Sequence, residues 1–107
     1  MARQLTITPA LIDHVRKFLG ETGAEFFAKT KREHGRYDAV YKEEGAAFPH
    51  PVHFREGMQV RNAMRDHPDT QGWSAHDYDD SWVHVVSLCL EAKGPLSPVT
   101  VELPSYA

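Results

Sequence analysis

Hydrophobic residues near the N-terminus follow the period of a strand and then that of a helix. Leu5 and Ile7 alternate with polar residues, which is typical of a short strand. Thr8-Pro9 is a favourable helix start, with threonine as N-cap and proline at the first helical position. The apolar residues that follow have helical spacing: Leu11, Ile12, Val15, Phe18 and Leu19. The pattern predicts a short strand and then a helix that ends near Gly20.

Two further helices are predicted before the middle of the chain. One runs from about residue 23 to residue 34 and ends at Gly35. A shorter one lies around residues 38–44, before a break at Gly45 and at the proline-containing segment 49–51. The first helix would turn Phe26, Phe27 and Thr30 inward, and the second would present Tyr37, Val40 and Tyr41 together.

The clearest later helix is predicted from about Val52 to Asp66. Its apolar stripe contains Phe54, Met58, Val60 and Met64. Gly57 lies within this stripe, although glycine costs about 1 kcal/mol relative to alanine in a helix interior. We expect another backbone or a bulky ring to approach closely at this position.

A last helix is predicted to begin at a cap provided by Ser74 or Asp79. The segment from Trp82 to Leu90 has only two polar residues, so we expect it to be central and buried. A buried strand is an alternative for this segment, because valine favours strands. The alternating residues of the tail at 99–103 predict a second strand, which would pair with the N-terminal one as a ribbon on the helices.

These elements predict a mainly α fold of four to five helices with a two-stranded β-ribbon formed by the two termini. We expect one domain over residues 1–107, with residues 95–107 as an extended tail. A chain of 107 residues is close to the commonest size of a single domain.

Composition predicts a cytoplasmic protein. One cysteine, Cys89, cannot form an internal disulfide, and no apolar stretch approaches the roughly 20 residues that span a bilayer. The net charge of −3 disfavours non-specific binding to nucleic acid. The chain is also rich in histidine, with seven residues, so its charge should depend on pH in mildly acidic conditions.

One candidate for chemistry is a group of histidines and aspartates between residues 67 and 80. Imidazole and carboxylate oxygen together suit a divalent transition metal, which could activate water for hydrolysis. The same aspartates are also expected to start a turn and to cap a helix, and we favour that structural role. The metal ligands under this alternative are His67, Asp69, His76 and Asp77.

Two groups of polar residues are candidates for structure or for partner binding. Arg61 next to Asn62 is expected to pair with Asp79 or Asp80 and hold two helices together, because the guanidinium is a planar donor for carboxylates. A basic run at the end of the second predicted helix could contact phosphate, but it also complements the helix dipole. The basic residues of interest are Lys29, Arg32 and Arg36.

Tyrosines supply the candidate surface for a protein partner. Tyr37 and Tyr41 are expected to be exposed, and tyrosine is enriched at interface hot spots. Trp73 and Trp82 are expected in the core, and Cys89 is expected to act as a small hydrophobe. Phosphate-binding loops, dinucleotide-binding glycine patterns and nucleophile elbows are absent from the sequence.

A segment covering about residues 53–90 resembles small bacterial and phage proteins of unknown function. Those proteins carry a His-x-x-x-Gly-x-x-x-Arg-Asn helix followed by an Asp-Asp-x-Trp helix. The resemblance implies one helix–helix unit and supplies no activity. The residues of this unit are His53, Gly57, Arg61, Asn62, Asp79, Asp80 and Trp82.

The sequence favours a non-catalytic interaction or regulatory domain that binds a larger protein and has no cofactor. The chain is small and its sequence holds no complete catalytic set. The first alternative is a small metal-dependent hydrolase, and the second is a nucleic-acid-associated protein. A homodimer is also compatible with the terminal strands, and no membrane association is expected.

Overall fold

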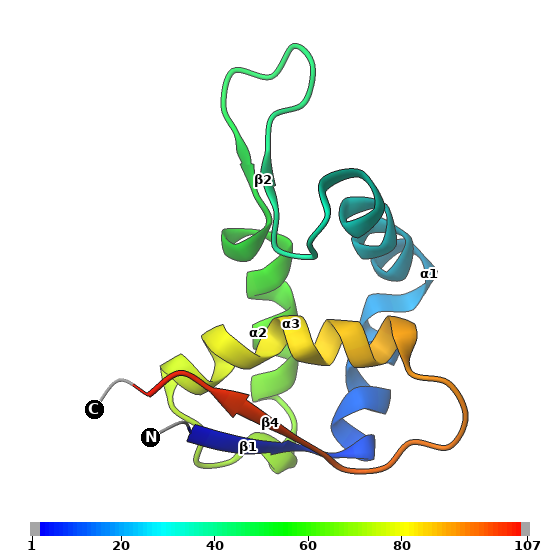
Figure 1. Cartoon of the computed structure of the whole chain (residues 1–107), viewed down its shortest axis with the longest axis vertical. Helices are drawn as coiled ribbons and strands as arrows, with labels where there is room; N and C mark the ends of the chain where they lie inside the picture. Colours follow the sequence, from blue (N-terminus) through cyan, green and yellow to red (C-terminus); the bar gives the residue numbers. More distant parts are fainter. Residues whose placement is uncertain (1–2, 106–107) are drawn as a thin grey trace.

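The computed structural model describes residues 3–105 and, within them, forms three α-helices and two small antiparallel sheets (Figure 1). The prediction of a mainly α fold is confirmed, but the predicted number of helices is too high. Two short 3₁₀ turns, η1 and η2, complete the chain. In order, the elements are β1 (Arg3–Ile7), α1 (Pro9–His34), β2 (Val40–Tyr41), β3 (His50–Pro51), η1 (Val52–Phe54), α2 (Glu56–Arg65), η2 (Pro68–Thr70), α3 (Ala75–Glu91) and β4 (Val99–Leu103).

Helix α1 joins two of the helices that the sequence predicts. Thr8 caps its start by accepting a hydrogen bond from the backbone N–H of Leu11. Gly20 has φ 60° and ψ −163°, so the helix kinks there, but helical structure resumes directly and no loop separates the halves. Gly35 ends the helix in the left-handed conformation, as expected for a glycine after the last turn.

Residues 38–44 do not form the predicted helix. Val40 and Tyr41 instead pair with Pro51 and His50 as the antiparallel strands β2 and β3. Valine and tyrosine favour strands, and this preference prevails where an antiparallel partner is available. We refer to residues 40–51 as the arm, because β2, β3 and their connecting loop project from the helical body (Figure 1).

Helix α2 begins four residues later than predicted. The chain turns at Arg55, which has φ −115° and ψ −91°, and residues 52–54 form the 3₁₀ turn η1. The predicted apolar stripe is therefore split. Val60 and Met64 are fully buried, whereas Phe54 is 67% exposed and Met58 is 44% exposed.

Helix α3 is the central element, and the alternative of a buried strand at residues 82–90 is wrong. Ser74 caps the helix in a capping box with Asp77. Its inward residues Trp82, Val85 and Val86 have no exposed surface. Both other helices and β4 pack against α3.

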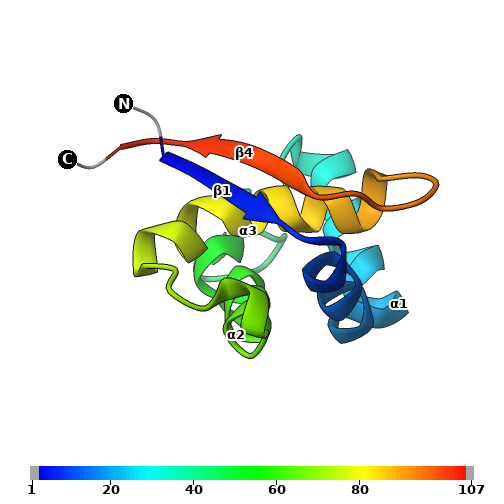
Figure 2. The ribbon, with the colours of Figure 1, turned by 90° about the horizontal axis from the view of Figure 1, so that it is seen from below.

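The predicted ribbon of the two termini is confirmed. Strands β1 and β4 are antiparallel, with Leu5 opposite Val101, and the ribbon lies over α3 (Figure 2). Ile7 and Leu103 are buried at opposite ends of the ribbon. Part of the predicted tail is therefore β4. Within the described residues, no helix is long and apolar enough to cross a membrane.

Candidate functional site

The polar cluster nearest the core joins η1 to α3. The indole Nε1 of Trp82 donates a hydrogen bond to Nδ1 of His53 over 3.1 Å. Nδ1 must be unprotonated to accept this bond, so the neutral ring carries its proton on Nε2. Burial lowers the pKa of His53, and the positive charge of Arg61 lowers it further. Both effects favour the neutral imidazole that the hydrogen bond requires.

Arg61 of α2 completes this cluster and is only 4% exposed. Its Nη1 lies 3.4 Å and 3.5 Å from the two ring nitrogens of His53, and its Nε lies 3.3 Å from Oδ1 of Asp79. Burial lowers the pKa of Arg61, and the carboxylate of Asp79 opposes that effect. The guanidinium thus connects η1, α2 and α3, with a single ion-pair contact to Asp79.

The other residues of the predicted helix–helix unit take different places. Gly57 packs against the Trp82 ring. Asn62 is exposed and accepts a hydrogen bond from Arg65 of its own helix. Asp80 pairs with Arg3 of β1 over 2.6 Å, so it connects α3 to the terminal ribbon. Asp80 also lines the cleft beside His53, where its negative charge opposes the lowering of the His53 pKa.

A polar cleft of about 570 Å³ opens beside this cluster, between the end of α1 and α3. Its carboxylates have cationic partners: Arg36 for Asp38, Arg61 for Asp79 and Arg3 for Asp80. Paired charges of this kind present little net field to a ligand. The cleft is lined by residues that include Tyr37, Asp38, His53, Asp79, Asp80 and His84.

The two tyrosines predicted to be exposed are held by neighbouring side chains. Tyr37 is only 6% exposed, so the expectation of an exposed ring is wrong there. Its hydroxyl donates to Oε2 of Glu91 over 2.6 Å, and burial together with this carboxylate raises its pKa. Tyr41 is half-buried between His34 and His50, with ring centroids 4.0 Å and 5.1 Å away. Burial raises the pKa of Tyr41 as well.

The basic residues at the end of α1 do not form one patch. Lys29 and Arg32 are exposed on the last turns, as expected for a solvated face. Arg36 lies just after the helix and pairs with Asp38 through two hydrogen bonds of 2.8 Å and 3.1 Å. Lys29 lines a second cleft, of about 630 Å³, which separates α1 from the arm and includes Tyr41.

Sequence reasoning missed the most exposed large hydrophobic residue on the arm. Phe48 is 81% exposed, and Val40 is 66% exposed. The sequence around Phe48, Ala46-Ala47-Phe48-Pro49, is an apolar run within a segment expected to be a loop. That combination is the feature that could have identified it.

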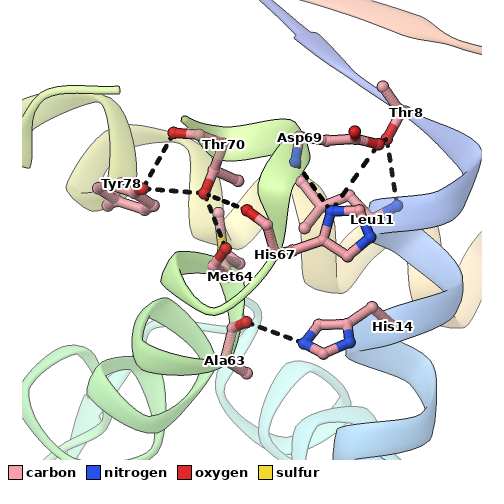
Figure 3. Close-up of polar contacts among 9 residues, drawn as sticks. All are labelled: Thr8, Leu11, His14, Ala63, Met64, His67, Asp69, Thr70 and Tyr78. Atoms are coloured by element: carbon pink, nitrogen blue, oxygen red, sulfur yellow. Dashed lines mark hydrogen bonds and ion pairs between the residues drawn. The ribbon is translucent and has the colours of Figure 1, made fainter. Parts of the chain in front are cut away.

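The four predicted metal ligands fall into two parts of the chain: His67 and Asp69 lie together in the connection that follows α2 (Figure 3), whereas His76 and Asp77 lie in the first turn of α3. Nδ1 of His67 accepts a hydrogen bond from the backbone N–H of Asp69, and the side chain of Asp69 accepts one of 2.5 Å from Thr8. Asp77 belongs to the cap of α3 and pairs with Arg3. His76 lies in the exposed first turn of α3. Within residues 3–105, no group of three or more histidine, cysteine or acidic side chains is placed to hold a metal ion.

A second histidine, His14 of α1, lies beside His67 (Figure 3). The ring centroids are 5.2 Å apart, and Nε2 of His14 is 3.0 Å from the carbonyl oxygen of Ala63. Close by, the hydroxyl of Tyr78 in α3 donates a hydrogen bond to the hydroxyl of Thr70 in η2. These contacts tie the start of α1 and α3 to the connection that follows α2, which is a structural role.

Comparison with protein-family models, with curated proteins and with solved structures found no match. Function is therefore inferred from the geometry of this chain.

Proposed function

We propose that the protein is a non-catalytic interaction domain that binds a larger protein through its arm. The observation that carries this proposal is Phe48, which is 81% exposed on a segment that projects from the helical body. Exposed aromatic side chains are favourable anchors because they bury a large area at low conformational cost. The partner would supply an apolar pocket for this ring.

The base of the arm is well anchored, which supports a docking role. Tyr41 of β2 stacks on His34 of α1 and on His50 of β3. His50 is also 2.7 Å from the carboxylate of Glu56 in α2. These contacts connect the arm to two helices. A pre-ordered docking element loses less conformational freedom on binding than a disordered loop does.

The central cluster supports a structural role for the residues that could otherwise act in catalysis. His53 uses Nδ1 as an acceptor for Trp82, and Asp79 faces the buried Arg61. A metal-dependent hydrolase that uses His67, Asp69, His76 and Asp77 has less support, because His67 and Asp69 contact each other whereas Asp77 is engaged in the cap of α3 and with Arg3. A nucleic-acid interface has less support because Glu33, Glu43 and Glu44 line the same cleft as Lys29 and offset its positive charge.

The proposal is tested by comparing two exposed phenylalanines on the full-length chain. Phe48→Ser removes the arm's anchor, whereas Phe54→Ser removes a ring that is 67% exposed but lies outside the arm. Proteins captured by the wild type and by Phe54→Ser, but not by Phe48→Ser, are then purified and titrated against each variant. We expect Phe48→Ser to weaken binding about tenfold or more. Equal affinities for the wild type and Phe48→Ser would overturn the proposal.

A further inference from the structure

The two-stranded sheet of the arm has an open edge beside a cleft. Strand β2 pairs with β3 alone, so its other edge has no strand partner within residues 3–105. The second cleft, of about 630 Å³, separates β2 from α1 (Figure 1). Five residues of α1 and residues 41–44 line it and, among residues 3–105, none of β3 does.

The register of the sheet shows which main-chain groups face this edge. The N–H of Val52 donates to the carbonyl oxygen of Ala39 over 3.4 Å, and Val40 lies opposite Pro51. Hydrogen-bonded and non-hydrogen-bonded pairs alternate along antiparallel strands, so the main-chain groups of Val40 and Lys42 point away from β3. Both residues are exposed, and within residues 3–105 neither main chain hydrogen-bonds to a loop, a cap or a side chain. These groups are open to a third strand.

The opposite edge of the arm is less suited to strand addition. Pro51 of β3 lies opposite Val40, in the same non-hydrogen-bonded pair, so its nitrogen faces outward and carries no hydrogen. Proline on an edge strand disfavours pairing with a further strand. A partner strand would therefore add to β2, on the side of the cleft.

The charged side chains around the cleft are available to a ligand. Lys29 and Lys42 bring positive charges, whereas Glu33, Glu43 and Glu44 bring negative ones, so carboxylates outnumber ammonium groups. Within the described part of the chain, residues 3–105, none of these side chains makes an ion pair. The excess of negative charge favours a ligand that carries a basic side chain.

We propose that an extended segment of the larger partner, with a basic side chain, binds in this cleft and adds to β2 as a third strand. Hydrogen bonds to the main chain of Val40 and Lys42 supply affinity, and alternate side chains of the segment enter the cleft. This inference rests on the proposed function, because it keeps the arm as the docking element and specifies what docks there besides the ring of Phe48.

The test uses random peptides of about ten residues, displayed on phage and selected against the full-length chain. We expect the selected peptides to share a basic residue. In NMR spectra of the isotope-labelled chain, they should slow the hydrogen exchange of the Val40 and Lys42 amides. A selection that enriches no peptide would overturn the proposal, as would enriched peptides that leave the exchange of both amides unchanged.

Two pairs of variants separate the main-chain contact from the charge. Lys42→Pro removes the N–H at the open edge and should weaken binding of the selected peptides about three- to tenfold. Lys42→Ala keeps the N–H and should bind them at least as tightly as the wild type. Glu33→Lys should weaken binding, and Glu102→Lys, which makes the same change of charge at an exposed position of β4, is its control.

Equal peptide affinities for Lys42→Pro and Lys42→Ala would overturn the strand addition. Circular dichroism and the NMR spectrum of the helical body show whether Lys42→Pro folds. If it does not fold, the exchange of the Val40 and Lys42 amides in the wild type decides the question.

The inference and the proposed function fail in different ways. Peptides that avoid the edge of β2 overturn the strand addition, but they leave the expected contrast between Phe48→Ser and Phe54→Ser in partner binding. Equal partner affinities for the wild type and Phe48→Ser overturn the proposed function, even where peptides bind β2.

Discussion

The indole ring of Trp82 lies against Gly57, at a position where no side chain fits. A Cβ atom at residue 57 would be 2.7 Å from Cζ2 of Trp82 and 2.9 Å from Cη2. The ring is fully buried and its Nε1 is held by His53, so it cannot move without breaking a polar contact. This close approach of α2 to α3 explains a glycine within a helix.

Gly57→Ala should therefore destabilise the fold, even though alanine favours helices. Forcing an extra carbon into a packed core typically costs about 1–3 kcal/mol. Urea unfolding, followed by circular dichroism, measures the loss. Gln59→Ala, at an exposed position of the same helix, is the control and should change stability by less than about 0.5 kcal/mol.

A double-mutant cycle shows whether the Trp82 ring is the cause. Phenylalanine lacks the part of the indole that meets residue 57, so Gly57→Ala should cost less in a Trp82→Phe background. An equal cost in both backgrounds would contradict the steric explanation, because contacting residues are expected to show a coupling energy.

Arg61→Lys should destabilise the protein by about 1–3 kcal/mol, because a buried hydrogen-bonded cation is replaced by one that cannot keep its contacts. The guanidinium reaches both His53 and Asp79, whereas an ammonium is a point charge. Thermal and urea unfolding measure the change. Arg65→Lys, on the exposed side of the same helix, is the control. An unchanged midpoint in Arg61→Lys would mean that this pair does not hold α2 to α3.

Stability should fall as the pH decreases below the ordinary histidine pKa of 6.5, in part because of His53. Its pKa in the folded protein is lowered by burial and by Arg61. The unfolded chain therefore binds the proton first, so the contribution of His53 is complete above pH 6.5 and is lost as the pH falls through the lower folded value.

His53→Gln keeps a hydrogen-bond acceptor for Trp82 and removes the titration. We expect unfolding free energies measured from about pH 8 to about pH 5 to decline less in this variant than in the wild type. His84→Gln, an exposed histidine of α3, is the control. Parallel pH profiles for the wild type and His53→Gln would show that His53 does not contribute.

Local patterns were sufficient for much of the fold. The Thr8-Pro9 start, the Gly35 end and the alternation in the terminal strands each depend on a few neighbouring residues, and the structure contains all three. At the helix end predicted near Gly20 the backbone does leave the helical conformation, with φ 60° and ψ −163°, but a second helical stretch follows directly and no loop separates the two.

The arm depended on contacts that spacing along the chain does not reveal. Val40 and Tyr41 became a strand because His50 and Pro51 lie opposite them. The burial of Tyr37 likewise depends on Glu91, which is 54 residues away and accepts its hydroxyl hydrogen bond. Long-range partners of this kind decide both the shape of the arm and which aromatic rings remain exposed.

The carboxylate of Glu91, at the end of α3, accepts hydrogen bonds from three side chains. These hydrogen bonds lower its pKa to about 2. The largest effect is the hydrogen bond from Tyr37, followed by those from Ser87 and Lys31. Because the folded pKa lies below the usual 4.5, the stabilisation by Glu91 is complete above pH 4.5 and is lost as the pH falls towards 2. Tyr37→Phe removes the hydroxyl, so the pKa of Glu91 should rise towards 4.5.

A carboxyl-detected NMR titration of Glu91 measures this change directly. Tyr41→Phe is the matched control, because Tyr41 makes no contact with Glu91 among those described. This variant should leave the pKa of Glu91 unchanged. In acid unfolding, Tyr37→Phe should lose less stability than the wild type between pH 4.5 and about pH 2, since less of a pKa difference remains to be titrated. A titration of Glu91 that is identical in the wild type and in Tyr37→Phe would show that the buried tyrosine is held by packing and not by this carboxylate.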